Sequence, residues 1–242
     1  MKYGIQLYSM RDLAQNDFEG AVKKASLIGY KMIEFAGFFG RSADDVNKIL
    51  SENNIELFGT HTSLHELIQN YDETVAFHKA IGNKNYIIPF HDLSDQTKID
   101  EFCALVNKYQ PMLEKEGIRL AFHNHSGEFK TNADGSVPYK AIVEKTSLFL
   151  EIDTFWVFHA GLDPIETLEK YKDRLLCIHL KDGLADGKGM PLGKGQAPVA
   201  SVYKKAVEMG LDIIVESETL IPSGAEECTV CFEFLKSVSK GE

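Results

Sequence analysis

Residues 118–129, with the sequence IRLAFHNHSGEF, begin as a buried strand and end in polar side chains. Gly117 interrupts the helical pattern before this stretch, and an apolar run at 120–122 follows it. The run stops at His123, and His125 and Glu128 come soon after. A buried strand that ends in this way is either a polar corner whose groups satisfy one another or part of a functional site. Taken alone, the stretch favours the polar corner, so the other strands decide the question.

Eight predicted strands alternate with helical patterns along the whole chain. Strands are expected at residues 3–8, 31–35, 55–61, 85–89, 118–122, 148–153, 175–180 and 212–216. Helices are expected at residues 18–28, 42–53, 71–80, 95–116 with a kink or break at Pro111, 139–145, from 163 onward, 199–209 and 226–239. Eight β-then-α units predict an α/β fold of the (β/α)8 TIM barrel type, which typically takes about 250 residues. A doubly wound sheet would more often show a glycine fingerprint after the first strand, and GIQLYS has none. No linker-like tract divides the sequence, so residues 1–242 are expected to form one domain.

Charge and hydropathy narrow the class of protein. The formal net charge of −10 argues against nucleic-acid binding, because proteins with that role usually carry a basic face. No apolar run approaches membrane-spanning length, and MKYGIQLYS lacks the layout of a signal peptide. We therefore expect a cytoplasmic protein that binds neither nucleic acid nor a membrane, with a homo-oligomer left open. Cys228 and Cys231 are expected to be two reduced thiols on one helix, because no second CxxC accompanies them.

Imidazoles and carboxylates gather at or just beyond the predicted strand ends. In a barrel these ends form one face, which is where barrel enzymes keep their active sites. Polar residues also gather wherever strands reach the surface, but that does not readily explain ends so rich in His, Asp and Glu and so poor in Ser and Thr. The candidates are Gln6, Glu34, His61, His91, His123, His125, Glu128, Asp153, His179, Lys181 and Glu216.

Three of these candidates, Asp153, His179 and Glu216, come from consecutive strands. Neighbouring strands lie about 4.8 Å apart, so the three side chains can meet at one point. Two carboxylates and an imidazole without a thiolate suit a catalytic Mn²⁺, Mg²⁺, Co²⁺ or Zn²⁺ ion. Such an ion could polarise the carbonyl of a sugar while a neighbouring base removes the α-proton. The residues alone leave a plain carboxylate–histidine ion pair open as the alternative.

Five motifs in register, QLYSMRD, FHNHSGEF, EIDTFWVFHAGLDP, HLKD and IIVESE, resemble those of the sugar phosphate isomerase/epimerase superfamily. These xylose isomerase-like TIM barrels include ketose 3-epimerases, inosose dehydratases and, more distantly, endonuclease IV. The resemblance covers the whole chain and implies a divalent-metal-dependent isomerase or epimerase in carbohydrate metabolism. It implies a small sugar or sugar derivative as substrate and a proton transfer α to a carbonyl through an enediolate. A lyase or dehydratase of a keto-sugar or keto-inositol at the same site is the alternative, and a non-catalytic sugar-binding barrel also stays open.

The resemblance implies metal ligands at the ends of strands five to eight. Where the epimerases have a strand-five glutamate, this chain has His123, so the fourth ligand is either His123 or Glu128 reaching back from the loop. We favour Glu128, because hard ions prefer carboxylates, and Glu151 is a weaker option on the strand face of Asp153. The predicted metal ligands are Glu128, Asp153, His179 and Glu216.

The resemblance also implies catalytic and substrate-binding groups. Trp156 stands where the epimerases and dehydratases have a histidine, so their proton relay cannot be transferred to this chain. Residues 183–195 are expected to be a lid or a flexible loop, and His65 and His78 are expected at the surface. The predicted catalytic residues are Glu216, Glu128, His125 and Lys181, and the predicted substrate-binding residues are Gln6, Glu34, His61, His123, Trp156 and Lys181.

Overall fold

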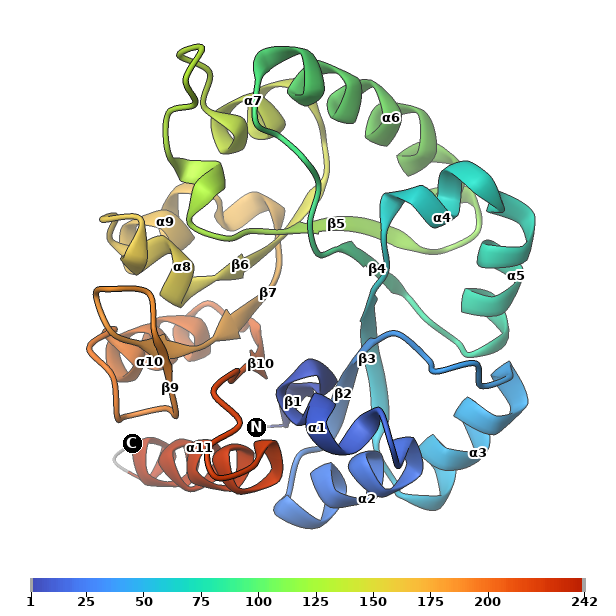
Figure 1. Ribbon diagram of the computed structural model, residues 1–242, viewed down its shortest axis with the longest axis vertical. Helices are drawn as coiled ribbons and strands as arrows, with labels where there is room; N and C mark the ends of the chain where they lie inside the picture. Colours follow the sequence, from blue (N-terminus) through green and yellow to red (C-terminus); the bar gives the residue numbers. More distant parts are fainter. Residues whose placement is uncertain (1, 241–242) are drawn as a thin grey trace.

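The structure is a computed structural model that describes residues 2–240, and its centre is a closed barrel of eight parallel strands (Figure 1). Each barrel strand pairs with the next barrel strand along the chain, and the last of them, β10, pairs with β1 to close the ring. The predicted (β/α)8 TIM barrel is therefore confirmed. The barrel strands are β1 (Tyr3–Gln6), β2 (Met32–Ala36), β3 (Glu56–His61), β4 (Asn85–Ile88), β5 (Arg119–His123), β6 (Phe149–Asp153), β7 (Leu175–Leu180) and β10 (Asp212–Val215).

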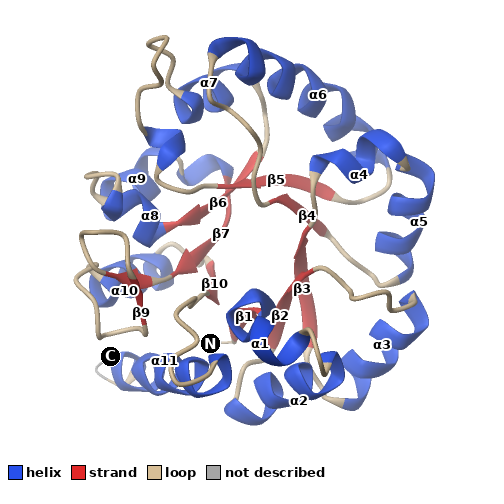
Figure 2. Ribbon diagram, in the orientation of Figure 1, coloured by secondary structure: helices blue, strands red, loops and turns tan. Residues whose placement is uncertain are grey.

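Helices form the outer ring around the strands (Figure 2). The α-helices are α1 (Arg11–Ala14), α2 (Phe18–Ile28), α3 (Ala43–Glu52), α4 (Leu64–Gln69), α5 (Tyr71–Ala80), α6 (Gln96–Lys115), α7 (Pro138–Lys145), α8 (Thr154–His159), α9 (Pro164–Lys170), α10 (Val199–Glu208) and α11 (Gly224–Ser239). Short 3-10 turns are η1 (Leu7–Met10), η2 (Gly127–Phe129) and η3 (Lys172–Arg174), and β8 (Asp182–Gly183) pairs with β9 (Gly189–Met190). Several helices begin where a side chain accepts a hydrogen bond from the first turn, which satisfies a backbone donor that the helix leaves free. These N-caps are Asp17, Ser42, Asp95, Asp163 and Ser223.

The structure differs from the sequence-based expectations in a few places. Pro111 does not break α6: the helix continues through it, with the proline on its exposed side and the opposite face packed on the barrel. Residues 154–159 form α8, which was not predicted, and residues 183–195 contain the small β8–β9 hairpin. His65 is exposed as expected, but the prediction for His78 was wrong, because α5 turns this side chain inward against Tyr86.

Alternate residues of each strand point into the barrel, and this alternation sets the depth of the site. An apolar layer that includes Ala121, Cys177 and Ile214 fills the lower part of the interior. Two residues further along the same strands come His123, His179 and Glu216, which are all buried. The barrel therefore has an apolar floor and a polar layer at the carboxyl ends of its strands. Among residues 2–240, no helix has the length and apolarity needed to cross a membrane.

Candidate active site

The polar layer joins neighbouring strands side by side. The register pairs Asp153 with His179 across β6 and β7, and His123 with Glu151 across β5 and β6. Glu216 follows the last residue of β10, and its backbone N–H donates to the carbonyl of Leu180 at 3.3 Å. All of these polar side chains are less than a tenth exposed, so water provides little of their solvation. Buried charges of this kind must be stabilised by one another or by a bound ion.

His123, Asp153, His179 and Glu216 converge at one point. Each offers one potential ligand atom, and the four atoms lie within 4.8 Å of one another. Asp153 and His123 each have a buried atom, Oδ2 and Nδ1, that has no hydrogen-bond partner among residues 2–240. Buried polar atoms are rarely left without a partner unless a bound water or ion satisfies them. Two carboxylates and two imidazoles also match the ligand preferences of Mn²⁺, Co²⁺ and Zn²⁺, so the residues present fit a divalent cation.

His179 is held from its other side by two deeper carboxylates. Its Nε2 lies 2.7 Å from Oε2 of Glu34 and 2.8 Å from Oε2 of Glu151, while its Nδ1 lies 3.4 Å from Oε2 of Glu216. An N–H at Nε2 that donates to these carboxylates leaves Nδ1 directed at the group that contains Glu216. Metal-bound histidines commonly donate their second ring nitrogen to a carboxylate in this way. The contact geometry therefore suits His179 as a ligand through Nδ1.

A second group of potential ligands consists of the half-buried His61 and the buried His123, Glu151 and His179, whose ligand atoms also lie within 4.8 Å of one another. His61 Nε2 is 3.0 Å from Oε1 of Glu151 and 3.3 Å from Oε2 of Glu34. Burial opposes the charged form of His61, but Glu34 and Glu151 outweigh it and raise its pKa. Gln6 donates from Nε2 to Oε2 of Glu34 at 2.8 Å. Three members of this group, His61, Glu151 and His179, are therefore already in contact with one another or with Glu34.

Lys181 links the carboxylates at the upper edge of the site. Its Nζ is 2.8 Å from Oε2 of Glu218, 3.3 Å from Oε2 of Glu216 and 3.9 Å from Oδ2 of Asp153. Burial favours neutral lysine, yet these carboxylates outweigh it and raise the pKa of Lys181. Burial raises the pKa of Asp153 to about 7, although Lys181 opposes that shift. For Glu216 burial acts in the same direction, but Lys181 and His179 prevail and hold its pKa well below the usual range.

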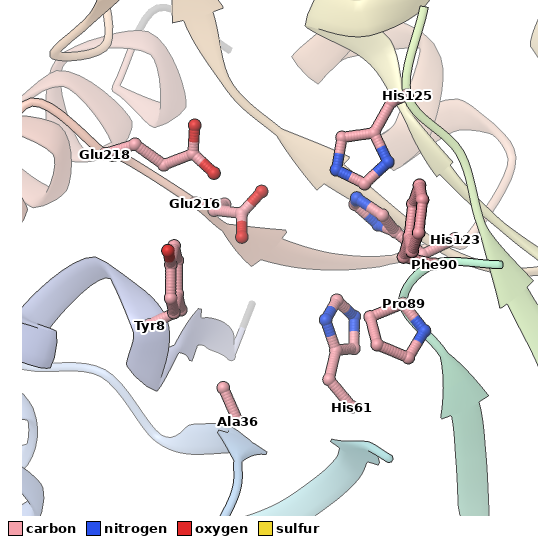
Figure 3. Close-up of a pocket in the computed structure, with 9 residues that line it drawn as sticks. All are labelled: Tyr8, Ala36, His61, Pro89, Phe90, His123, His125, Glu216 and Glu218. Atoms are coloured by element: carbon pink, nitrogen blue, oxygen red, sulfur yellow. The ribbon is translucent and has the colours of Figure 1, made fainter. Parts of the chain in front are cut away.

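A cavity of about 380 Å³ opens above the cluster. In Figure 3, His123, His125 and Glu216 lie around this cavity, and His61 lies at its lower edge. Other lining residues were not predicted from the sequence, although Glu218 lies two residues after Glu216 in VESE and so shares its direction. The unpredicted lining residues are Tyr8, Ala36, Pro89, Phe90 and Glu218.

Some predicted site residues lie outside this cavity. Oε2 of Glu128 accepts a hydrogen bond at 2.9 Å from the backbone N–H of His125, and Glu128 belongs to neither group of potential ligands among the described residues. Glu128 and His91 instead line a smaller cleft of about 230 Å³ beside the cavity. Gln6 is fully buried beneath the site and does not line the cavity. Trp156 stacks beside Lys181, whose Nζ is 4.7 Å from its ring centroid.

Comparisons with known proteins agree with this architecture. Residues 22–230 match the family described as "Xylose isomerase-like TIM barrel". An inosose dehydratase of Clostridium beijerinckii is 25% identical over 201 residues, covering 73% of this chain and 67% of that protein. The chain spans about two thirds of the length of the curated Clostridium inosose dehydratases that it matches.

Two solved structures show the same fold. The structure of a sugar phosphate isomerase/epimerase from Parabacteroides distasonis superposes with a TM-score of 0.85 at 21% identity, covering 97% of both chains. The structure of an L-ribulose 3-epimerase superposes with a TM-score of 0.78 at 14% identity, covering 100% of this chain and 95% of that one. At these identities the likeness concerns the fold.

Proposed function

Because the chain belongs to the xylose isomerase-like TIM barrel family, we propose that it is a divalent-metal-dependent isomerase or epimerase of a sugar or sugar derivative. The reaction would move a proton α to a carbonyl through an enediolate. The observation that carries the proposal is the convergence of four ligand atoms within 4.8 Å, two of which belong to residues with an unpartnered buried atom. The relatives named inosose dehydratase and epimerase also share one feature, because each name describes an enzyme that modifies a sugar or a related compound.

Asp153, His179, Glu216 and His123 would hold the ion. His123 takes the fourth position in this proposal, because its ring lies with the other three ligands whereas Glu128 lies outside the group. Burial and the neighbouring histidines lower the pKa of His123, so it is a neutral imidazole with a lone pair to donate. A divalent ion bound here would polarise the carbonyl of a sugar and stabilise the negative charge that develops on its oxygen.

Glu216 and His125 would move the proton. Glu216 is ionised, because Lys181 and His179 beside it outweigh its burial, so a carboxylate faces the cavity. Burial lowers the pKa of His125, so its neutral ring can accept a proton near pH 7. An isomerase would deliver a proton to the neighbouring carbon, whereas in an epimerase one group would remove the proton and the other would deliver a proton to the opposite face of the same carbon. Glu128 would position His125, because it accepts the hydrogen bond from the His125 backbone.

Lys181 and Trp156 would shape the charge and the surface of the site. Lys181 is fixed by three carboxylates and would keep Glu216 ionised as well as steady the developing oxyanion. Trp156 packs against the Lys181 ammonium, and the face of its indole ring would pack on the C–H face of a sugar. Glu34 and His61 would support the site from below through their contacts with His179 and Glu151.

Solvent exchange tests the proposal directly. The protein is incubated in deuterated water with Mn²⁺ and a panel of ketoses, and deuterium at the carbon α to the carbonyl is followed by NMR. We expect incorporation by the native chain, with a loss of at least about a hundredfold in Glu216→Gln, because a general base typically contributes that much or more. Glu233→Gln, on the exposed face of α11, is the matched control and should exchange normally. No exchange across a broad panel would contradict the proposal.

A lyase is the second candidate, because the curated relatives are named inosose dehydratases. The first step would be the same abstraction of the α-proton, followed by loss of a hydroxyl or glycosyl group from the β-carbon. Growth of enone absorbance with a keto-inositol or a 3-keto-glycoside would favour this reaction. Deuterium exchange without enone formation would favour the isomerase.

A further inference from the structure

We propose that the substrate is a phosphate-free sugar joined to an aromatic or apolar group, and that a groove beside Tyr8 and Phe39 holds that group. This inference rests on the proposed function, because it names the substrate class of the same site. It is carried by two separate observations, the charges that line the cavity and the position of the exposed aromatic rings.

The cavity offers no free cation to a phosphate group. Within residues 2–240, the side chains that line it include Glu216 and Glu218 but neither lysine nor arginine. Lys181, just below the lining, is already in contact with both of these glutamates. Phosphate is usually bound by arginine, lysine or several backbone N–H groups. A phosphorylated sugar would therefore place a dianion beside two carboxylates whose cation is already paired.

Arg11 lines the groove beside the cavity, and both of its terminal nitrogens donate to the protein backbone. Its Nη1 donates to the backbone carbonyl of Tyr8 at 3.0 Å, and its Nη2 donates to that of Glu218 at 2.8 Å. The guanidinium carbon lies 4.3 Å from the centre of the Tyr8 ring. Arg11 thus fixes the orientation of an aromatic ring at the mouth of the cavity.

Exposed aromatic rings are concentrated at this mouth. Among the described residues, the large hydrophobic side chains with high exposure include only three aromatic ones, Tyr8 at 43%, Phe39 at 50% and Phe90 at 64%. Tyr8 and Phe90 line the cavity, on opposite sides of it in Figure 3, and Phe39 lines the groove that continues from it. Single exposed apolar residues are ordinary, but a cluster at a site entrance marks a binding surface.

The groove is continuous with the cavity. Its volume is about 250 Å³, and it shares Tyr8 and Ala36 with the larger cavity. Beyond this junction its walls include the apolar side chains of Leu7, Ala14 and Phe39 and the polar side chains of Arg11 and Gln15. A sugar ring held over Glu216 could thus extend a substituent past the small side chain of Ala36 and between two aromatic rings. The apolar and aromatic walls suit a flat or apolar group, and Arg11 is stacked on the Tyr8 ring at the edge of the groove.

The single tryptophan of the chain provides the readout. Trp156 is the only tryptophan in the sequence and stacks on Lys181 at the site, so ligand binding should change its fluorescence. The Mn²⁺-supplemented protein is titrated with the phenyl and methyl β-glycosides of glucose, galactose and xylose, and with glucose and glucose 6-phosphate. In at least one sugar pair we expect the phenyl glycoside to bind about tenfold more tightly than the methyl glycoside. Glucose 6-phosphate should bind no more tightly than glucose.

Variants locate the effect in the groove. Phe39→Ala should remove most of the phenyl advantage and leave the Kd of the methyl glycoside within about twofold, because Phe39 lines only the groove. Ala36→Leu, which narrows the junction, should act in the same direction and serves as the second variant if Phe39→Ala folds poorly. Leu27→Ala removes an apolar side chain that is 74% exposed on α2 away from the cavity lining, and it should change neither ligand.

Equal affinities within every pair, absence of binding by all glycosides, or tighter binding of glucose 6-phosphate than of glucose would each overturn the inference. Deuterium exchange separates this failure from failure of the proposed function. Exchange without a phenyl preference refutes the substrate class alone. A phenyl preference without metal binding or exchange keeps the substrate class and refutes the metal enzyme.

Discussion

At the scale of single residues, the orientation of His179 depends on the carboxylates beneath it. Glu151 accepts from Nε2 at 2.8 Å and also contacts His61, so one carboxylate orients two rings. Glu151→Gln keeps the shape of the side chain but removes its charge. We expect Mn²⁺ affinity to fall by about 10- to 100-fold, as is typical when the hydrogen-bond partner of a ligating histidine is lost.

Paramagnetic resonance of free Mn²⁺ measures this affinity without relying on turnover. Glu56→Gln, at the exposed start of β3, is the matched control and should bind Mn²⁺ like the native chain. An unchanged Kd in Glu151→Gln would mean that this carboxylate does not orient the ligand. Two ions bound per native chain would instead identify the deeper histidine–glutamate group as a metal site of its own.

His78 gives a pH dependence of stability that is separate from the site. Burial lowers its pKa from 6.5 to about 4, and Asn83 Nδ2 lies 3.0 Å from its Nδ1 as the donor to a neutral ring. The unfolded chain therefore binds a proton at this residue below pH 6.5, while the folded chain does not until about pH 4. The free energy of unfolding should fall by about 3 kcal/mol as the pH drops through this window, and His78 should add no further loss below it.

Urea unfolding at a series of pH values measures the slope. In His78→Gln the part of the slope between pH 6.5 and 4 that belongs to this residue should disappear, whatever the absolute stability of the variant. An identical slope in both chains would show that His78 is not the group responsible.

At the scale of elements, the sequence predicted which strand residues face the barrel interior and which residues cap the helices, but it did not predict the conformation of the loops. The alternation in EID, HLK and VESE places Asp153, His179 and Glu216 on one inner face, and N-cap chemistry at Ser42 and Asp95 gives the helix starts. Helix α8 was missed because its aromatic and β-branched residues favour strand, whereas in the fold Asp153 caps it by accepting from two N–H groups. The position of Glu128 depends on the η2 turn, whose conformation no sequence periodicity specifies.

The loop after β7 is held by one carboxylate. Asp182 is 1% exposed and accepts backbone hydrogen bonds at 2.8–3.1 Å from Gly183, Gly193, Gly195 and Ala197. Asp182→Ala would leave these N–H groups without their acceptor and should cost about 3 kcal/mol or more of stability. Limited proteolysis should then cut within residues 183–197, which include the turn and the second strand of the β8–β9 hairpin.

Asp186→Ala is the control for this prediction, because Asp186 is an exposed residue of the same loop that accepts only from the Lys188 backbone. Its cleavage pattern should match that of the native chain. Equal protease resistance in Asp182→Ala would mean that the hairpin orders the loop without the carboxylate.

At the scale of the whole molecule, several of the chain's carboxylates are buried together at one end of the barrel. Glu34, Glu151, Asp153 and Glu216 are buried there, against Lys181 and the histidines, in a protein of net charge −10. A divalent cation would relieve the repulsion between these carboxylates, and it would bind the folded chain far better than the unfolded one. Without a bound ion the polar layer should therefore destabilise the folded state, and a bound divalent cation should stabilise it.

Thermal unfolding tests this consequence with Mn²⁺, Mg²⁺, Co²⁺ and Zn²⁺. At an ion concentration of 100 times the Kd, binding to the folded state alone contributes about 2.7 kcal/mol. For a chain of this size that corresponds to a rise in Tm of about 5–10 °C, which EDTA should reverse. Asp153→Asn, which removes the charge of a proposed ligand, should abolish the rise, while Glu233→Gln should retain it. If no ion raises the Tm of the native chain, the converging side chains are an ion-pair cluster that stabilises itself, and the barrel would bind sugars without metal chemistry.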